Sequence, residues 1–104
     1  MGINYGDLMK QARVMQKQLE TVQEELKNMV FESSSGGGAV LVKVNGDQLL
    51  LEIKINKEIV YSDDIEMLED IVMVAVNDAI KKSKDEYKNK MGSLTGGMNM
   101  PGLF

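Results

Sequence analysis

The chain of 104 residues contains no cysteine, no histidine and no tryptophan. Without cysteine it can form neither a disulfide bond nor a thiolate nucleophile, which is typical of proteins from a reducing cytoplasm. Without histidine and cysteine it also lacks the usual base at neutral pH and the usual zinc ligands. These absences argue against an enzyme and against a metal site, and we expect no cofactor.

Long apolar runs and large side chains are scarce as well. No apolar run reaches the length of a membrane-spanning helix, and the first ten residues lack the apolar core of a signal sequence. We therefore expect a cytoplasmic protein with no membrane association. With two Phe, three Tyr and nine Met, the core must be thin, so we expect a second copy of the chain to cover part of the apolar surface.

The first strong pattern is a seven-residue repeat in residues 8–29. Its apolar positions, separated by alternating steps of four and three, are Leu8, Ala12, Met15, Leu19, Val22, Leu26 and Met29. This spacing predicts one long helix with a narrow apolar seam on one side. Asn4 is a favoured N-cap residue, so the helix is predicted to begin near Asn4 and to end near Asn28.

The middle of the chain predicts three short antiparallel strands, near residues 29–34, 39–44 and 48–55. Gly36-Gly37-Gly38 predicts the turn between the first two, because three successive glycines interrupt a strand. A phosphate-binding loop is a poor alternative, since no Gly-Lys-Ser/Thr follows.

Asn45-Gly46 predicts a two-residue hairpin between the second and third strands, because both central residues of a type I′ turn need positive φ. Such a turn would pair Val42 with Leu49 and Val40 with Leu51. The sheet would then have one fully apolar face, which needs to be covered.

A second long helix is predicted from about residue 63. Asp63 followed by Glu66 resembles a capping box, and the run IEMLEDIVMVAVNDAI is apolar on most of its circumference, which indicates burial on several sides. Gly92 predicts the end of this helix. We therefore expect one domain over residues 1–92, followed by a Gly/Met-rich tail over residues 93–104.

Together these elements predict an α+β fold of α-β-β-β-α order, with a three-stranded antiparallel sheet and two long helices of about 40 Å each. We expect the helices to pack antiparallel, so that the start of the first meets the end of the second at a tip far from the sheet. The seam of the first helix would lie against the second helix, aided by a second subunit near the sheet.

The net charge of −4 conceals an uneven distribution along the chain. Residues 1–18 carry +2 and residues 81–104 carry +3, whereas residues 19–32 carry −3 and residues 63–80 carry −6. Antiparallel helices would gather the bases at the tip and the acids near the sheet. Local positive potential of this kind attracts a polyanion. Ordinary solvated faces are the alternative, since the charges of the second helix also follow the helix dipole.

No known catalytic or base-reading motif accompanies this pattern. The acids near residue 63 lack the spacing of an EF-hand, and the chain contains no helix-turn-helix or zinc-finger signature. If the chain binds DNA, phosphate contacts from lysine and arginine should therefore dominate.

The order of elements, with MLEDIVMVAVNDAIKKSKDEYKNKMGSLTGG and the closing PGLF, resembles the YbaB/EbfC family of bacterial nucleoid-associated DNA-binding proteins. The resemblance covers nearly the whole chain, including MKQARVMQKQLETVQEEL and GGGAVLVKVNG. It implies a tweezer-like homodimer of α-β-β-β-α protomers that binds double-stranded DNA in the nucleoid with limited sequence specificity. It further implies an effect on gene expression or nucleoid organisation.

The resemblance also implies site residues, because basic residues near the helix tips of that family are implicated in DNA contact. The matching positions here are Lys10, Arg13, Lys17, Lys81, Lys82, Lys84, Lys88 and Lys90. The apolar sheet face and the early second helix are expected to hold the dimer, including Leu68, Val72, Ala75 and Ala79.

The alternative is a protein-interaction module. In that case the helix tips or the tail would dock on a recombination or repair protein, or on another cytoplasmic partner. The tail residues that could do so are Met98, Met100, Leu103 and Phe104.

Overall fold

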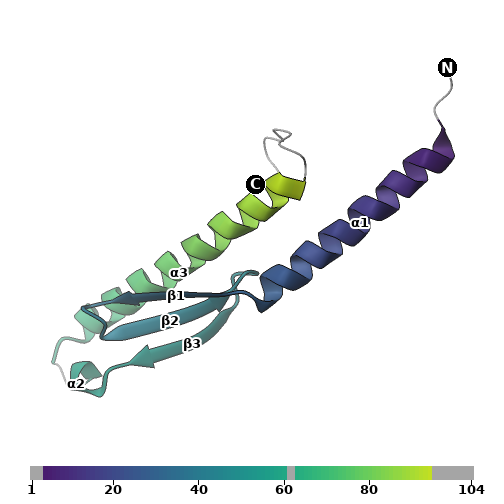
Figure 1. The fold of residues 1–104 in the computed structure, drawn as a ribbon. Coiled ribbons are helices and arrows are strands. Elements are labelled where there is room, and N and C mark those ends of the chain that lie inside the picture. The colour runs from purple at the N-terminus through teal and green to yellow at the C-terminus, as the bar shows by residue number, and fades with distance from the viewer. Residues whose placement is uncertain (1–3, 61–62, 95–104) are drawn as a thin grey trace.

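The computed structural model describes residues 4–60 and 63–94, and the protein is elongated, with principal extents of 74 × 24 × 16 Å (Figure 1). Its elements in chain order are α1 (Tyr5–Asn28), β1 (Val30–Ser35), β2 (Val40–Asn45), β3 (Leu50–Ile55), α2 (Lys57–Val60) and α3 (Ile65–Leu94). The predicted α+β class, the α-β-β-β-α order and the three antiparallel strands are confirmed. The short helix α2 was not predicted.

The core lies between α3 and the first two strands of the sheet, whose order is β1-β2-β3. Val40, Val42 and Val44 on β2 are fully buried against Ala75 and Ala79 of α3. The two alanines are one helical turn apart, and their small side chains let the helix backbone lie close to the valines. This contact covers one side of α3 only. Met73 and Val74 on its other sides are 55% and 58% exposed, so the described residues do not bury this part of the helix on several sides as predicted.

β3 lies beyond the part of the sheet that α3 covers. Val40 pairs with Ile55 and Val42 pairs with Ile53, so the two isoleucines share the sheet face of the buried valines. Nevertheless Ile53 is 40% exposed and Ile55 is 38% exposed. The edge strand therefore presents an apolar strip that the described part of the chain does not cover.

The register predicted from Asn45-Gly46 is wrong. Val42 pairs with Ile53 and not with Leu49, because the turn is longer than two residues and a bulge between Lys43 and Val44 shifts the pairing once more. The Asn45 N–H donates to the Leu49 carbonyl at 2.9 Å, and Gln48 has a φ of 61°. A tight turn followed by a left-handed residue is the usual geometry of a three-residue hairpin loop, and it shifts the pairing that follows.

Gly46 is required for close packing and not for a positive φ. Its N–H donates to the Leu26 carbonyl at 2.8 Å, at the end of α1. A Cβ atom at this position would lie 2.2 Å from the same oxygen. Only glycine allows the hairpin to meet the end of α1 this closely, so the residue that predicted a turn type instead joins two elements.

The predicted helix starts are nearly right, and one helix end is wrong. The Asn4 side chain caps α1 by accepting from the N–H groups of residues 6 and 7 at 3.0 and 3.3 Å. Asp64, not Asp63, caps α3, because it accepts from the N–H of Met67 at 3.0 Å. Gly92 does not end α3, which continues to Leu94. The remaining tail, residues 95–104, lies outside the described residues.

The two long helices run antiparallel but do not end together. Leu94, at the end of α3, lines the same groove as Val14 of α1. Tyr5 lies nine residues before Val14, or about 14 Å along the helix. Figure 1 shows this first part of α1 extending past the end of α3. The predicted common tip is therefore wrong. The first half of α3 packs across the sheet, whereas α1 lies wholly beyond the ends of the strands.

Candidate nucleic-acid interface

The apolar seam of α1 is covered only near the sheet. Leu26 is fully buried, Leu19 and Val22 are half-buried, and Met15 and Leu8 are 45% and 47% exposed. The prediction that the seam lies against the other long helix is thus right for the half near the sheet. Between the start of α1 and Val14, no described residue covers the seam.

Three basic residues lie along α1 between residues 10 and 17. Lys10, Arg13 and Lys17 are exposed, and their spacing of three and four residues places them on one side of the helix. Within residues 4–60 and 63–94, none of them has a carboxylate within 4.0 Å. They form a row of unpaired positive charge about 10 Å long.

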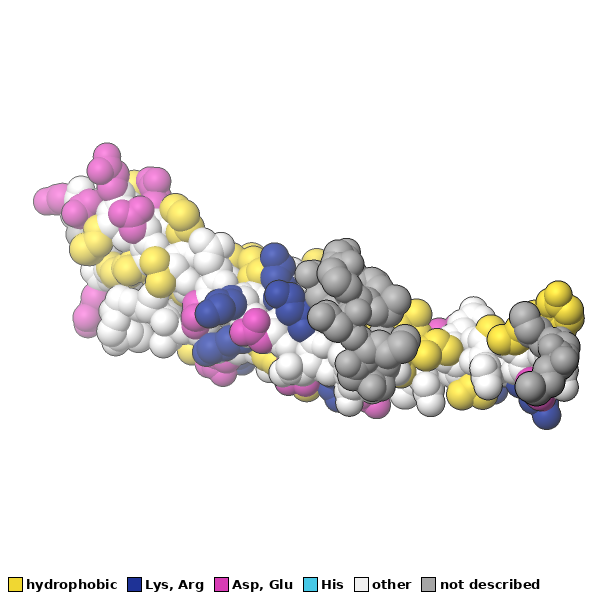
Figure 2. All heavy atoms as spheres, turned by 90° about the horizontal axis from the view of Figure 1, so that it is seen from above, with side chains coloured by type: hydrophobic (Ala, Val, Ile, Leu, Met, Phe, Trp, Pro, Cys, Tyr) yellow, Lys and Arg dark blue, Asp and Glu magenta, His cyan; other side chains and the backbone are white. Residues whose placement is uncertain are grey.

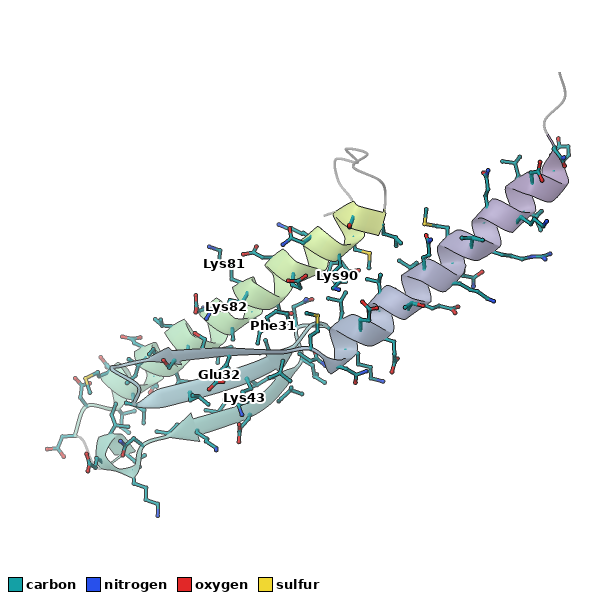
Figure 3. All side chains as sticks on the ribbon, in the orientation of Figure 1. Phe31, Glu32, Lys43, Lys81, Lys82 and Lys90 are labelled. Carbon is teal, nitrogen blue, oxygen red and sulfur yellow. The ribbon has the colours of Figure 1, made fainter. Side chains whose placement is uncertain are left out.

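The same spacing recurs on α3 with Lys81, Lys84 and Lys88, which are also exposed. They too lack a carboxylate partner within the described part of the chain. Figure 3 shows Lys81 on the side of α3 turned away from the sheet. Because Ala75 and Ala79 define the side that faces the sheet, the helical period places this second row on the opposite side of α3.

The other two predicted lysines are paired within the protomer. Lys82 donates to the Glu32 carbonyl at 3.0 Å and lies 3.6 Å from the Asp78 carboxylate. Lys90 donates to Glu25 of α1 at 3.2 Å. The i,i+4 spacing of Asp78 and Lys82 was a signal available in the sequence. The pairing of Lys90 with Glu25, 65 residues apart, was not.

Asp78 is held in its charged form at the junction of α3 and β1. The Ser33 hydroxyl donates to its carboxylate at 2.6 Å, and this hydrogen bond, with the positive charge of Lys82, holds the pKa of Asp78 below its usual value. The carboxylate therefore remains available to Lys82 in mildly acidic solution. It connects strand, helix and lysine in one small network.

Acidic side chains gather at the opposite end of the molecule from the start of α1. Figure 2 shows them clustered over the end where α3 begins, and the exposed members there include Asp63, Asp64, Glu66, Glu69 and Asp70. Within residues 4–60 and 63–94, no group of three His, Cys, Asp or Glu side chains is arranged to hold a metal ion. Over the same ranges, no helix combines the length and hydropathy needed to cross a bilayer.

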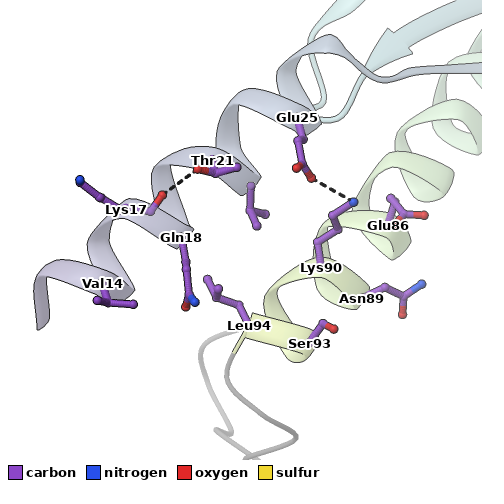
Figure 4. A pocket seen from close by; sticks show the side chains of 11 residues that line it. Val14, Lys17, Gln18, Thr21, Glu25, Glu86, Asn89, Lys90, Ser93 and Leu94 are labelled. Carbon is purple, nitrogen blue, oxygen red and sulfur yellow. Dashed lines mark hydrogen bonds and ion pairs between the residues drawn. The ribbon is translucent and has the colours of Figure 1, made fainter. Parts of the chain in front are cut away.

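A groove of about 740 Å³ separates the second half of α1 from the end of α3 (Figure 4). It is open to solvent, and the bond between Glu25 and Lys90 crosses it at the end near the sheet. Its walls are Val14, Lys17, Gln18, Thr21, Val22 and Glu25 of α1, and Glu86, Asn89, Lys90, Ser93 and Leu94 of α3. Sequence periodicity did not predict it.

The structure places the predicted dimer residues mostly inside one protomer. Ala75 and Ala79 have no exposed surface, and Leu68 and Val72 are half-buried against the core. Larger exposed apolar surface lies on and beside β3, at Leu49, Leu50, Leu51, Ile53 and Ile55. The Leu-rich run 49–51 was the available signal for this surface.

The sequence matches a model of the YbaB/EbfC DNA-binding family over residues 1–98. A nucleoid-associated protein of Clostridium novyi is 50% identical over 103 residues, which cover 99% of this chain and 90% of that protein. A nucleoid-associated protein of Clostridium perfringens is 54% identical over 101 residues, covering 97% of this chain and 90% of that protein.

The fold is also similar to a solved structure. The crystal structure of an uncharacterized protein from Helicobacter pylori superposes with a TM-score of 0.83 at 27% sequence identity. The match covers 91% of this chain and 100% of that chain. The whole arrangement described above, and not one element of it, is therefore shared with that protein.

Proposed function

Since this chain belongs to the YbaB/EbfC DNA-binding family, we propose that it binds duplex DNA through the two rows of unpaired bases on α1 and α3. The family is one of non-enzymatic architectural proteins. Family membership favours this function over the alternative of a module that docks on another protein.

The observation that carries the proposal is the repeated pattern of free charge. Each row holds three side chains at the same spacing on one side of a helix, and none has a carboxylate partner within the described residues. A duplex presents one phosphate charge per roughly 1.7 Å of axis, so a row about 10 Å long meets several phosphates. Phosphate contacts carry no sequence information, and limited sequence specificity follows.

The acidic end of the molecule does not cancel this attraction. Charges further apart than about 8 Å are largely screened at physiological salt. The protein is 74 Å long, and the largest cluster of acids lies at the end away from the start of α1. The local potential along the rows therefore decides the interaction, in spite of the net charge of −4.

The proposal includes a homodimer that acts in the nucleoid, within the cytoplasm. The open apolar strip on β3 supports it, because an edge strand with exposed leucines and isoleucines is a template for a second copy. Two copies would present twice as many rows to one duplex, which raises the avidity without any new kind of contact. The tweezer-like arrangement and an influence on gene expression or nucleoid organisation belong to the same proposal.

Charge reversal tests the role of the α1 row. The variant with Lys10→Glu, Arg13→Glu and Lys17→Glu should abolish the gel shift of a duplex. The matched control reverses Lys43, Lys54 and Lys57, which lie on the sheet and α2 and change the net charge by the same amount. The control should keep most of its binding. Equal losses in both variants would show that net charge, and not the row, determines binding.

Salt dependence tests the contribution of the α3 row. Affinity should fall as salt rises. Replacing Lys81, Lys84 and Lys88 by Gln should make this dependence less steep, reducing the magnitude of the slope of log affinity against log salt by about 0.9 for each phosphate that the protein no longer neutralises. Fluorescence anisotropy with duplexes of different sequence would measure this slope. An unchanged slope would remove α3 from the interface.

A further inference from the structure

We propose that residues 98–104 of the chain occupy the groove between α1 and α3 of the same protomer and thereby fasten the two helices together. The inference does not depend on DNA binding. It follows from the chemistry of the groove, from the place where α3 ends and from the composition of the residues that follow.

The groove has a mixed lining that includes exposed apolar side chains. Val14 and Val22 contribute from α1 and Leu94 from α3, and Val14 is 55% exposed. The charged lining residues balance, since Lys17 and Lys90 stand against Glu25 and Glu86, so the groove has no net charge to attract a polyanion. A volume of about 740 Å³ lies in the range of pockets that hold small organic groups, and a few apolar side chains would fit it.

The chain leaves α3 at the mouth of this groove. Leu94 is the last helical residue and also one of the lining residues. Ten residues follow it in the sequence, and ten residues can span at most about 35 Å. From Val14 to Glu25 the groove follows α1 for about 17 Å. The segment therefore has ample length to reach any part of the groove in its own protomer.

The composition of this segment suits the apolar part of the groove. Residues 91–104 contain no charged side chain, although 27% of the chain is charged. Gly96-Gly97 permits the reversal of direction that a return from the end of α3 requires. The apolar side chains follow these glycines, and they are Met98, Met100, Leu103 and Phe104. Methionine in particular adapts to irregular surfaces.

Disulfide trapping tests the proposal, because the chain has no native cysteine. The test variant carries Gln18→Cys, in the groove, with Met100→Cys. The matched control carries Gln23→Cys, on another side of α1, with Met100→Cys. We expect the test pair to close a disulfide within one chain at least about tenfold faster than the control, at a rate independent of protein concentration.

The other outcomes overturn the proposal in distinct ways. A disulfide between two chains, whose yield falls on dilution, would show that the tail of a second copy fills the groove. Equal rates for both pairs would show that the tail does not occupy it. As a second measurement, truncation after Leu94 should speed hydrogen exchange of the amides between Val14 and Glu25. Unchanged exchange there would also refute the proposal. DNA binding can fail while both results hold, so the two proposals are separable.

Discussion

The two ends of α1 carry the same pattern but lie in different surroundings. Leu26 and Leu8 both belong to the seven-residue seam, yet Leu26 is fully buried and Leu8 is 47% exposed. The difference comes from Gly46, whose missing side chain lets the hairpin approach Leu26, and from α3, which ends before it reaches Leu8. Periodicity specifies which side of a helix is apolar, and only packing specifies what covers it.

The basic residues show the same contrast. Lys82 and Lys90 near the sheet are held by backbone and carboxylate partners, whereas Lys10 and Arg13 on the extended part of α1 have no ion pair in the described chain. Basic residues are thus paired where the fold brings an acceptor close to them, and are free for a ligand elsewhere.

The largest expected effect is the difference in stability between alanine variants of the two leucines. Leu26→Ala should lower the free energy of unfolding by about 2–5 kcal/mol, because it leaves a cavity in a fully buried site. Leu8→Ala should change it by less than about 0.5 kcal/mol, because the site is half open. Urea unfolding would measure both. A large loss at Leu8 that fades at low protein concentration would show that a second copy covers the end of α1.

Gly46→Ala should come next, with a loss of about 2–3 kcal/mol, because the new Cβ would overlap the Leu26 carbonyl oxygen and force α1 away from the hairpin. The loss should appear in thermal unfolding, with faster hydrogen exchange at the amide of residue 46. Tolerance of alanine would mean that the junction between helix and hairpin is looser than the structure describes.

Gly92→Ala is the matched glycine substitution, and it should stabilise the protein where Gly46→Ala destabilises it. Gly92 lies inside α3, and a Cβ there would meet no atom of residues 4–60 and 63–94 within 4 Å. Removing a helical glycine should raise the free energy of unfolding by about 0.5–1 kcal/mol. Destabilisation would show that the end of α3 is packed against something that needs the space.

The smallest expected effect is on the pH dependence of stability. Because the folded pKa of Asp78 lies below its ordinary value, its contribution to stability is present above that value and is lost as pH falls through the folded pKa. Ser33→Ala removes the hydrogen bond that lowers this pKa most, so the melting temperature should depend less on acid below about pH 5. Ser34→Ala, at the exposed neighbouring position, is the control. Identical profiles for both variants would exclude the network as the cause.

Much of the fold was predictable because it depends on neighbours in the sequence. The seven-residue seam of α1, the Asn4 cap and the glycine triplet each act within a few residues, and the structure confirms them. The triplet takes φ values of 63°, 69° and 91°, as a turn built from glycine allows. The exposed bases of the candidate interface were predictable for the same reason, since charge and spacing are local.

What the sequence by itself determined is therefore the type, order and polar sides of the elements, because local sterics and periodicity act wherever the chain goes. Tertiary structure decided the rest. It brought Gly46 against the Leu26 carbonyl, paired Lys90 with Glu25, and left the start of α1 extending past the end of α3. These outcomes depend on where distant segments meet in space, and no pattern of neighbouring residues specifies such a distance.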